Sequence, residues 1–109
     1  MRRNRMQAFS RRLVAENRLG VDDLIWPLFV IEGENQTEAI DAMPGVSRHS
    51  VDRLLEQAHQ AVELGIPAIA IFPSIDASLK DASGTLAQDG DNLVCRAVRA
   101  VKSACPDLG

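Results

Sequence analysis

Leu64-Gly65-Ile66-Pro67-Ala68-Ile69-Ala70-Ile71-Phe72-Pro73 is the stretch that decides the fold of this chain of 109 residues. It contains no charged residue and no alternation of apolar with polar side chains. A strand that is apolar at every position is buried on both faces, which is typical of parallel sheets. Residues 51–64 carry apolar side chains at helical spacing, and Gly65 ends that helix. Helix, glycine and buried strand form the second half of a βαβ unit, so we predict an α/β fold.

A second wholly apolar run, Ile25-Trp26-Pro27-Leu28-Phe29-Val30-Ile31, lies nearer the N-terminus. Because Pro27 has no N–H to donate, we expect it at the first residue of the strand and the strand itself at residues 28–31. Residues 34–50 then read as a long loop with a Pro-Gly turn, and long ordered loops are often functional.

A polar segment, residues 74–90, follows the second predicted strand. The carboxyl end of a parallel strand is where α/β proteins place active-site loops, although a mobile surface loop is the alternative. A second helix is predicted from residue 92 to about residue 104, with Asp91 as its cap and Pro106 beyond its end.

Composition places the chain among ordinary globular proteins, with 46% hydrophobic and 25% charged residues. No apolar run is long enough to span a membrane, and no apolar segment follows Arg2, Arg3 and Arg5 as in a secretory signal, so we expect a cytoplasmic protein. The two cysteines lie too far apart along one helix for a disulfide, and neither histidine has a second ligand nearby. We therefore predict no metal site in this chain.

Charge is distributed unevenly: residues 1–20 sum to +5, whereas residues 21–109 sum to −8. The acidic body and the aromatic content of 4% argue against nucleic acid as the partner. In the basic arm, Phe9 and Leu13 could pack on a neighbouring subunit while Arg11 and Arg12 pair with its acids. A solvated arm is the alternative, and the residues alone leave both open.

The spacing of the two strands suggests a longer protein. They begin near Leu28 and Ile66, and a third strand at the same interval would begin just beyond Gly109. Two parallel strands that are apolar on both faces leave hydrophobic edges uncovered. We therefore expect an arm (1–20) followed by the first two βα units (21–109) of a truncated (β/α)8 TIM barrel. An open doubly wound sheet is the competitor, but no glycine-rich phosphate loop follows the first strand.

Several short segments, in this order, carry a further pattern: Arg3-Asn4-Arg5, Ser10-Arg11-Arg12-Leu13-Val14, Asp23-Leu24-Ile25-Trp26-Pro27-Leu28-Phe29-Val30, Met43-Pro44-Gly45-Val46, residues 64–73, Leu79-Lys80-Asp81 with Gly84, and residues 91–100. Together they resemble the N-terminal third of porphobilinogen synthase (5-aminolevulinate dehydratase) of bacterial type. The resemblance implies a (β/α)8 barrel in a homo-octamer, with an arm that embraces a partner subunit through Phe9, Arg11, Arg12 and Leu13. It also implies condensation of two 5-aminolevulinate molecules to porphobilinogen in tetrapyrrole and haem synthesis.

The same resemblance places the catalytic groups outside this chain. Two lysines on late strands form the family's Schiff bases, and a segment after the third strand binds zinc or magnesium; all would lie beyond Gly109. Lys80 and Lys102 do not match those lysines, and only Phe72 matches a substrate-pocket position. We expect the chain alone to be inactive and to bind no metal. The alternative is a non-catalytic module that docks onto full-length subunits through its basic arm.

Overall fold

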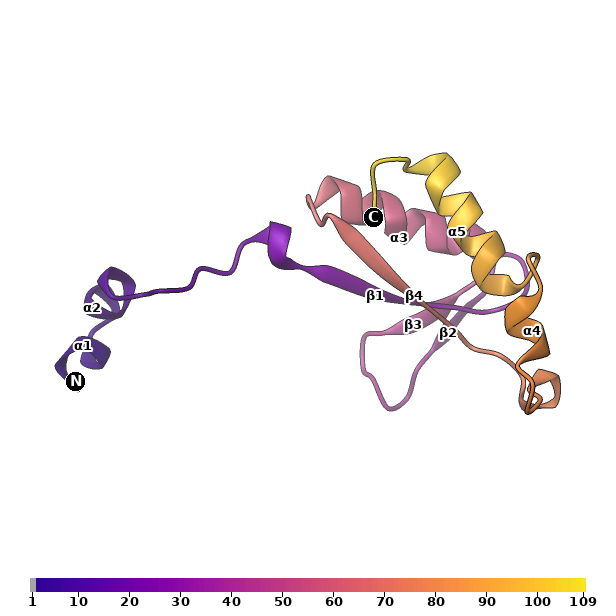
Figure 1. The fold of residues 1–109 in the computed structure, drawn as a ribbon. Helices are drawn as coiled ribbons and strands as arrows, with labels where there is room; N and C mark the ends of the chain where they lie inside the picture. The colour runs from indigo at the N-terminus through magenta and orange to yellow at the C-terminus, as the bar shows by residue number, and fades with distance from the viewer. Residues whose placement is uncertain (1) are drawn as a thin grey trace.

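A computed structural model describes residues 2–109 (Figure 1). Its helices are α1 (Arg3–Met6), α2 (Ala8–Leu13), α3 (Val51–Glu63), α4 (Thr85–Gln88) and α5 (Leu93–Ala104). Its strands are β1 (Ile25–Val30), β2 (Thr37–Ala39), β3 (Ser47–His49) and β4 (Ala68–Pro73), with single 3₁₀ turns at Val21–Asp23 and Ala77–Leu79. None of the helices in this part of the chain is long and apolar enough to cross a membrane.

The four strands form one sheet in the order β2-β3-β1-β4. The predicted βαβ unit is present: β1 and β4 pair in parallel over six residues, from Ile25 opposite Ala68 to Val30 opposite Pro73. On its other side β1 pairs with β3 only at Phe29 and Val30.

Beyond β3, the strand β2 pairs antiparallel with it. Residues 34–50, predicted as a loop without strands, therefore contain a short hairpin. Its strands are polar, and the pair Glu38–Arg48 spans them at 2.7 Å.

The position of Pro27 corrects the predicted start of the first strand. The strand begins at Ile25, so Pro27 is its third residue, not its first. Because β3 reaches only the last two residues of β1, Pro27 lies where β1 is an edge on that side, and a missing N–H is tolerated on an edge.

Helices α3 and α5 pack together on one face of the sheet (Figure 1). Side chains alternate between the faces of a strand, so Leu28 and Val30 of β1 and Ile69 and Ile71 of β4 face these helices. The helices contribute Leu54, which is completely buried, among others. The buried core consists of Leu28, Val30, Leu54, Ala58, Ala61, Leu93, Ala97, Val101, Cys105 and Leu108.

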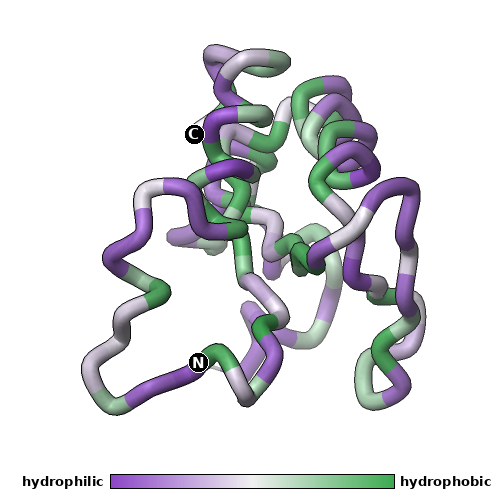
Figure 2. The backbone as a smooth tube through the Cα atoms, turned by 90° about the vertical axis from the view of Figure 1, so that its right-hand side faces the viewer, coloured by the Kyte–Doolittle hydropathy of each residue, from purple (hydrophilic) through white to green (hydrophobic). Residues whose placement is uncertain are grey.

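Hydrophobic and hydrophilic residues alternate along the helical coils in Figure 2, as expected for helices with one face on a sheet. The turn from α3 to β4 uses Gly65 as predicted, with a φ of +75° that favours glycine. Asn92, not Asp91, caps α5: its side chain accepts a hydrogen bond of 2.9 Å from the Cys95 N–H.

The opposite face of the sheet is apolar, and none of the helices within residues 2–109 packs on it. It carries Ile25, Pro27 and Phe29 from β1 and, in register with them, Ala68, Ala70 and Phe72 from β4. Ile25 is 65% exposed and Phe72 is 49% exposed. Helices α3 and α5 therefore cover only one face of these strands, and the other face, which their apolar sequence suits to burial as well, is exposed in residues 2–109.

The outer edge of β4 is partly occupied by the end of the chain. The N–H of Gly109 donates to the Pro67 carbonyl at 2.9 Å, and the Ile69 N–H donates to the Gly109 carbonyl at 2.9 Å. These two bonds flank Ala68 in the pattern of a parallel ladder. Lys102 holds this segment in place, because its Nζ donates to the carbonyls of Pro106 (2.6 Å) and Leu108 (2.8 Å).

Candidate functional site

The carboxyl ends of β1 and β4 lie side by side and bring two loops together. Residues 31–36 follow β1 and residues 74–92 follow β4, where the sequence predicted an active-site loop. In parallel α/β sheets this edge carries the ligand sites. The second loop is more structured than predicted, since it contains the 3₁₀ turn Ala77–Leu79 and helix α4.

Phe72 lies at this edge, on the open face of the sheet. Its ring pairs with that of Phe29, with 5.6 Å between centroids and 33° between planes. It does not belong to the buried core between sheet and helices, so the open face presents an aromatic pair to whatever covers it. Its role in a substrate pocket stays a prediction.

An ion pair joins the two βα units at the same edge. The Arg96 guanidinium on α5 donates to the Glu32 carboxylate, directly after β1. This hydrogen bond, and then the charge of Glu32, raises the pKa of Arg96. Arg99 makes a similar contact within one unit, donating to the Asp91 carboxylate and the Gly90 carbonyl.

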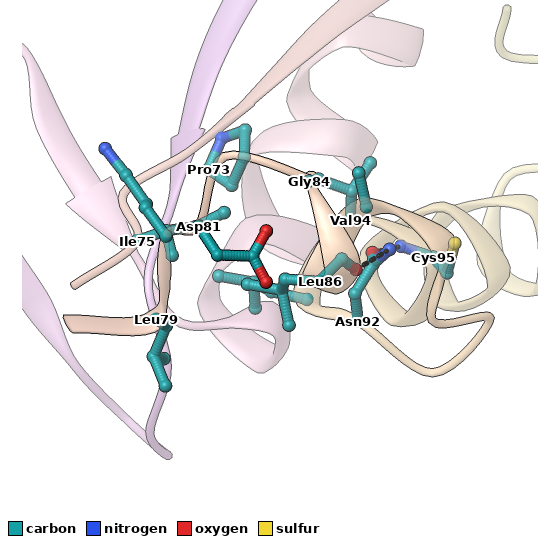
Figure 3. Close-up of a pocket in the computed structure, with 12 residues that line it drawn as sticks. Pro73, Ile75, Leu79, Asp81, Gly84, Leu86, Asn92, Val94 and Cys95 are labelled. Carbon is teal, nitrogen blue, oxygen red and sulfur yellow. Dashed lines mark hydrogen bonds between the residues drawn. The ribbon is translucent and has the colours of Figure 1, made fainter. Parts of the chain in front are cut away.

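A pocket of about 570 Å³ opens beside the end of β4 (Figure 3). Most of its wall is apolar, and its polar members are Lys80, Asp81 and Asn92. The lining residues are Pro73, Ile75, Leu79, Lys80, Asp81, Gly84, Leu86, Ala87, Asn92, Leu93, Val94 and Cys95. In Figure 3 the Asp81 carboxylate lies between the side chains of Ile75 and Leu86. The pocket wall is therefore mainly apolar, with one acidic and one basic side chain, Asp81 and Lys80.

Two aspartates of the loop after β4 cap local turns. Asp81 accepts hydrogen bonds from the N–H groups of Ser83 (3.1 Å) and Thr85 (2.9 Å). The pKa of Asp81 is lowered, chiefly by its hydrogen bonds with Thr85. Asp76 accepts from the N–H and hydroxyl of Ser78, which lower its pKa in the same way. Both carboxyls therefore stay ionised near neutral pH.

The arm residues singled out from the sequence lie on α2. Phe9 is 57% exposed and Leu13 is 81% exposed, so neither is buried by its own chain. Arg11 Nη1 donates to the Arg5 carbonyl at 2.9 Å, which is a contact within the arm. The structure thus places these residues together on an exposed arm, and the predicted contact with a second subunit stays a prediction.

Side chains that could bind a metal ion are not clustered in the part of the chain that the structure describes. Among residues 2–109 no group of three or more His, Cys, Asp and Glu side chains could hold a metal ion. His49 Nδ1 lies 3.2 Å from the Thr37 hydroxyl, in the hairpin. Cys95 and Cys105 are free, and Cys105 is buried in the core. These residues do not fit a zinc or magnesium site, so no metal chemistry is assigned to them.

Two features of this edge escaped sequence reasoning. The strands of the hairpin β2–β3 are short and mostly polar, with Ala39 as their one apolar residue, so hydrophobic periodicity gave no signal. The pocket is formed by several short segments between residues 73 and 95, and only the polar composition of residues 74–90 and their place after a buried strand pointed to this region.

The parallel pairing of β1 with β4, the helices α3 and α5 on one face of these strands and the loops at their carboxyl ends place the chain in the class of parallel α/β proteins. The sequence profile of the delta-aminolevulinic acid dehydratase family matches residues 1–109. The delta-aminolevulinic acid dehydratase of Bradyrhizobium diazoefficiens is 53% identical over 108 residues, which are 99% of this chain and 31% of that protein. That of Chlamydia pneumoniae is 41% identical over 98% of this chain and 32% of its own length.

A solved structure agrees with these relatives. Delta-aminolevulinic acid dehydratase (porphobilinogen synthase) from Toxoplasma gondii, in complex with the reaction product porphobilinogen, superposes with a TM-score of 0.86 and 40% identity. The match covers 98% of this chain and 30% of that one. The chain belongs to the delta-aminolevulinic acid dehydratase family, a family of lyases also called porphobilinogen synthase, and it spans about a third of the length of these relatives.

Proposed function

We propose that this chain supplies the N-terminal arm (1–20) and the first two βα units (21–109) of a (β/α)8 barrel in a cytoplasmic porphobilinogen synthase. That enzyme condenses two 5-aminolevulinate molecules to porphobilinogen in tetrapyrrole synthesis. The observation that carries the proposal is the family match over residues 1–109, together with the superposition on a relative that holds porphobilinogen.

The open sheet face supports the barrel. In a (β/α)8 barrel, helices cover the outside of the strands and side chains of the strands fill the inside. Here α3 and α5 cover one face, and an apolar face with Phe29 and Phe72 is left on the other. The bonds from Gly109 to Pro67 and Ile69 give the direction that a third parallel strand would follow along β4.

The chemistry would depend on residues outside this chain. A Schiff-base lysine needs a free amine near neutral pH, which burial provides by lowering the lysine pKa. Lys80 is exposed in the loop after β4, and the Nζ of Lys102 is engaged with two carbonyls at the end of α5. Neither is suited to the reaction, so the chain alone should be inactive. Phe72 would contribute an apolar wall at the carboxyl end of the barrel.

The arm would serve as a contact between subunits of a homo-oligomer. Phe9 and Leu13 are exposed, and an apolar pair on a short helix gains stability only when another surface covers it. The acidic body of a second copy offers charges for Arg11 and Arg12. The same features would let the chain act as a non-catalytic module that docks onto full-length subunits.

The reading frame after the codon for Gly109 tests the proposal. We expect a further strand of the form Asp-x-x-x-x-Pro-Tyr and then a cluster of metal ligands. The extended protein should convert 5-aminolevulinate to porphobilinogen, and residues 1–109 alone should not. Unrelated sequence or a stop codon there, with co-purification of full-length subunits that is lost on deleting residues 1–19, would favour the docking module instead.

A further inference from the structure

The loop after β1 is attached to helices of two different βα units. At its far end, the Asn35 N–H donates to the Asp52 carboxylate at 2.9 Å, and the Arg53 Nε donates to the Asn35 side-chain oxygen at 2.8 Å. Both contacts are with α3, the helix of the same unit. At its near end, Glu32 accepts a hydrogen bond from Arg96 on α5, the helix of the next unit. Glu32 therefore ties this loop to the second unit.

Arg96 is held from both sides at this contact. Its Nε is buried and, within residues 2–109, has no hydrogen-bond partner, while its Nη2 donates to the Glu32 carboxylate. The side chain as a whole is 40% exposed. Loss of the Glu32 charge would leave a guanidinium that is partly withdrawn from water without its carboxylate, and the side chain would gain by turning into solvent.

The ion pair lies next to the contact that brings the carboxyl ends of β1 and β4 together. The Ser74 N–H, just after β4, donates to the carbonyl of the completely buried Val30 at 2.8 Å. Glu32 follows Val30 by two residues, and Phe29 precedes it by one. The Phe29 ring lies 5.6 Å from that of Phe72, which is two residues before Ser74. Separation of the strand ends would therefore alter the aromatic pair.

We propose that Glu32 and Arg96 are positioning residues, whose ion pair keeps the carboxyl ends of β1 and β4 together and so holds Phe72 against Phe29. The inference rests on the proposed function in one respect, namely that Phe72 forms an apolar wall of the substrate pocket. The pair would act through Phe72 and would not contact the reacting atoms. An apolar wall away from those atoms contributes to substrate binding, so its displacement should change KM more than kcat.

A second ion pair on the same helix provides a matched comparison. Arg99, three residues after Arg96 on α5, donates to the Asp91 carboxylate. Arg99 and Asp91 are eight residues apart and both follow β4, so their contact does not join the two units. A variant of this pair therefore removes a surface charge beside α5 without loosening the contact between β1 and β4.

Amide exchange in the chain of residues 1–109 tests the structural half of the proposal. Glu32→Gln keeps an acceptor oxygen but removes the charge, and it should lower the protection of the Ser74 amide roughly two- to fivefold, the range of an exposed ion pair. The Leu54 amide, which donates to the Ser50 carbonyl in the core, reports on global unfolding and should change less. Asp91→Asn should change neither amide. Equal changes at Ser74 and Leu54, or none at Ser74, would overturn the proposal.

Variants of Arg96 show whether the two residues act as a pair. In an Arg96→Gln background, Glu32→Gln should lower the protection no further, and equal losses in both backgrounds would contradict the pairing. Arg96→Lys keeps a cation and should retain more of the protection than Arg96→Gln. The nuclear Overhauser effect between the rings of Phe29 and Phe72 should weaken in the same variants that lose protection.

Steady-state kinetics of the protein extended to the full length of its relatives tests the functional half. Glu32→Gln and Arg96→Gln should each raise KM for 5-aminolevulinate roughly two- to fivefold with kcat nearly unchanged, and Asp91→Asn should alter neither constant. A merely structural role would reduce the amount of folded enzyme, which lowers the apparent kcat at constant KM. That result would overturn the positioning role.

The two measurements separate this inference from the proposal beneath it. If the extended protein does not convert 5-aminolevulinate, the proposed function fails, and amide exchange still decides whether the ion pair holds the strand ends together. If the extended protein is active and its KM is the same with and without the Glu32 charge, only the positioning inference fails.

Discussion

Successive side chains of β1 and β4 point alternately to the two faces of the sheet, and the two faces have opposite surroundings. On one face Leu28 and Val30 are buried under α3 and α5. On the other, Ile25 and Phe72 are 65% and 49% exposed although they are just as apolar. The difference shows that the composition of these strands suits a protein in which both faces are covered, and that residues 2–109 cover only one.

The largest expected difference between the faces is in the free energy of unfolding. Leu54→Ala removes a completely buried side chain beneath the covered face and should cost about 2–5 kcal/mol. Phe72→Ala on the open face should cost about 1 kcal/mol, because half of that side chain is already exposed. Urea titrations followed by circular dichroism measure both. Equal losses would mean that the open face is also packed.

The open face should also drive self-association of the isolated chain. Ala70→Glu places a charge among apolar side chains on that face and should weaken association roughly tenfold or more. Sedimentation velocity over a concentration series measures this. Ser103→Glu, on the exposed side of α5, is the control and should leave association unchanged. If the isolated chain sedimented as a single monomeric species at every concentration, the open face would not mediate self-association.

The turn that joins α3 to β4 lies on the covered side and tolerates little change. Gly65 has a φ of +75°, so Gly65→Ala should destabilise the chain by about 1 kcal/mol. Gly90→Ala is its matched control, because an added Cβ there meets no atom within 4 Å and the φ is not in the left-handed region. Thermal unfolding of the two variants should differ by several degrees, and identical curves would contradict the role of Gly65.

The smallest effect concerns the loop at the carboxyl edge and depends on pH. Asp76 and Asp81 have lowered pKa values because their ionised forms accept local hydrogen bonds. Such groups stabilise the folded loop above the ordinary carboxyl pKa of about 3.9 and lose that contribution as the pH falls through their folded values. The protection of the Ser78 and Thr85 amides, taken as the exchange rate relative to the intrinsic rate at each pH, should therefore decrease below about pH 4. Asp76→Asn and Asp81→Asn should flatten the response, and an unchanged pH dependence would contradict this origin.

Much of the fold could be predicted because its signals are local. Gly65 and the stripe of α3 define a helix end, and the apolar run after it defines a buried strand. The hairpin β2–β3 could not be predicted, since it depends on backbone pairing beside β1 and on Glu38–Arg48 across two polar strands. Likewise, the position of Pro27 within β1 depends on how far β3 extends, which no local pattern records.

The candidate site was predictable in outline only. A polar loop after a buried strand indicated the edge where residues 74–92 lie. The contact between Glu32 and Arg96 joins residues 64 positions apart, and the pocket wall comes from several segments, so both depend on the completed packing. The resemblance to porphobilinogen synthase added the family, which the comparisons bear out.

Thiol labelling of the open face tests the central claim most directly. In a background with Cys95→Ser and Cys105→Ala, Ile25→Cys reports on the open face of β1, where the native side chain is 65% exposed, and Val30→Cys reports on the covered face, where it is completely buried. The account predicts that Ile25→Cys reacts readily in the monomeric chain and becomes protected when the chain is extended to the full length of its relatives, while Val30→Cys is protected in both. Protection of Ile25→Cys in the monomeric chain, or equal reactivity in both forms, would contradict it.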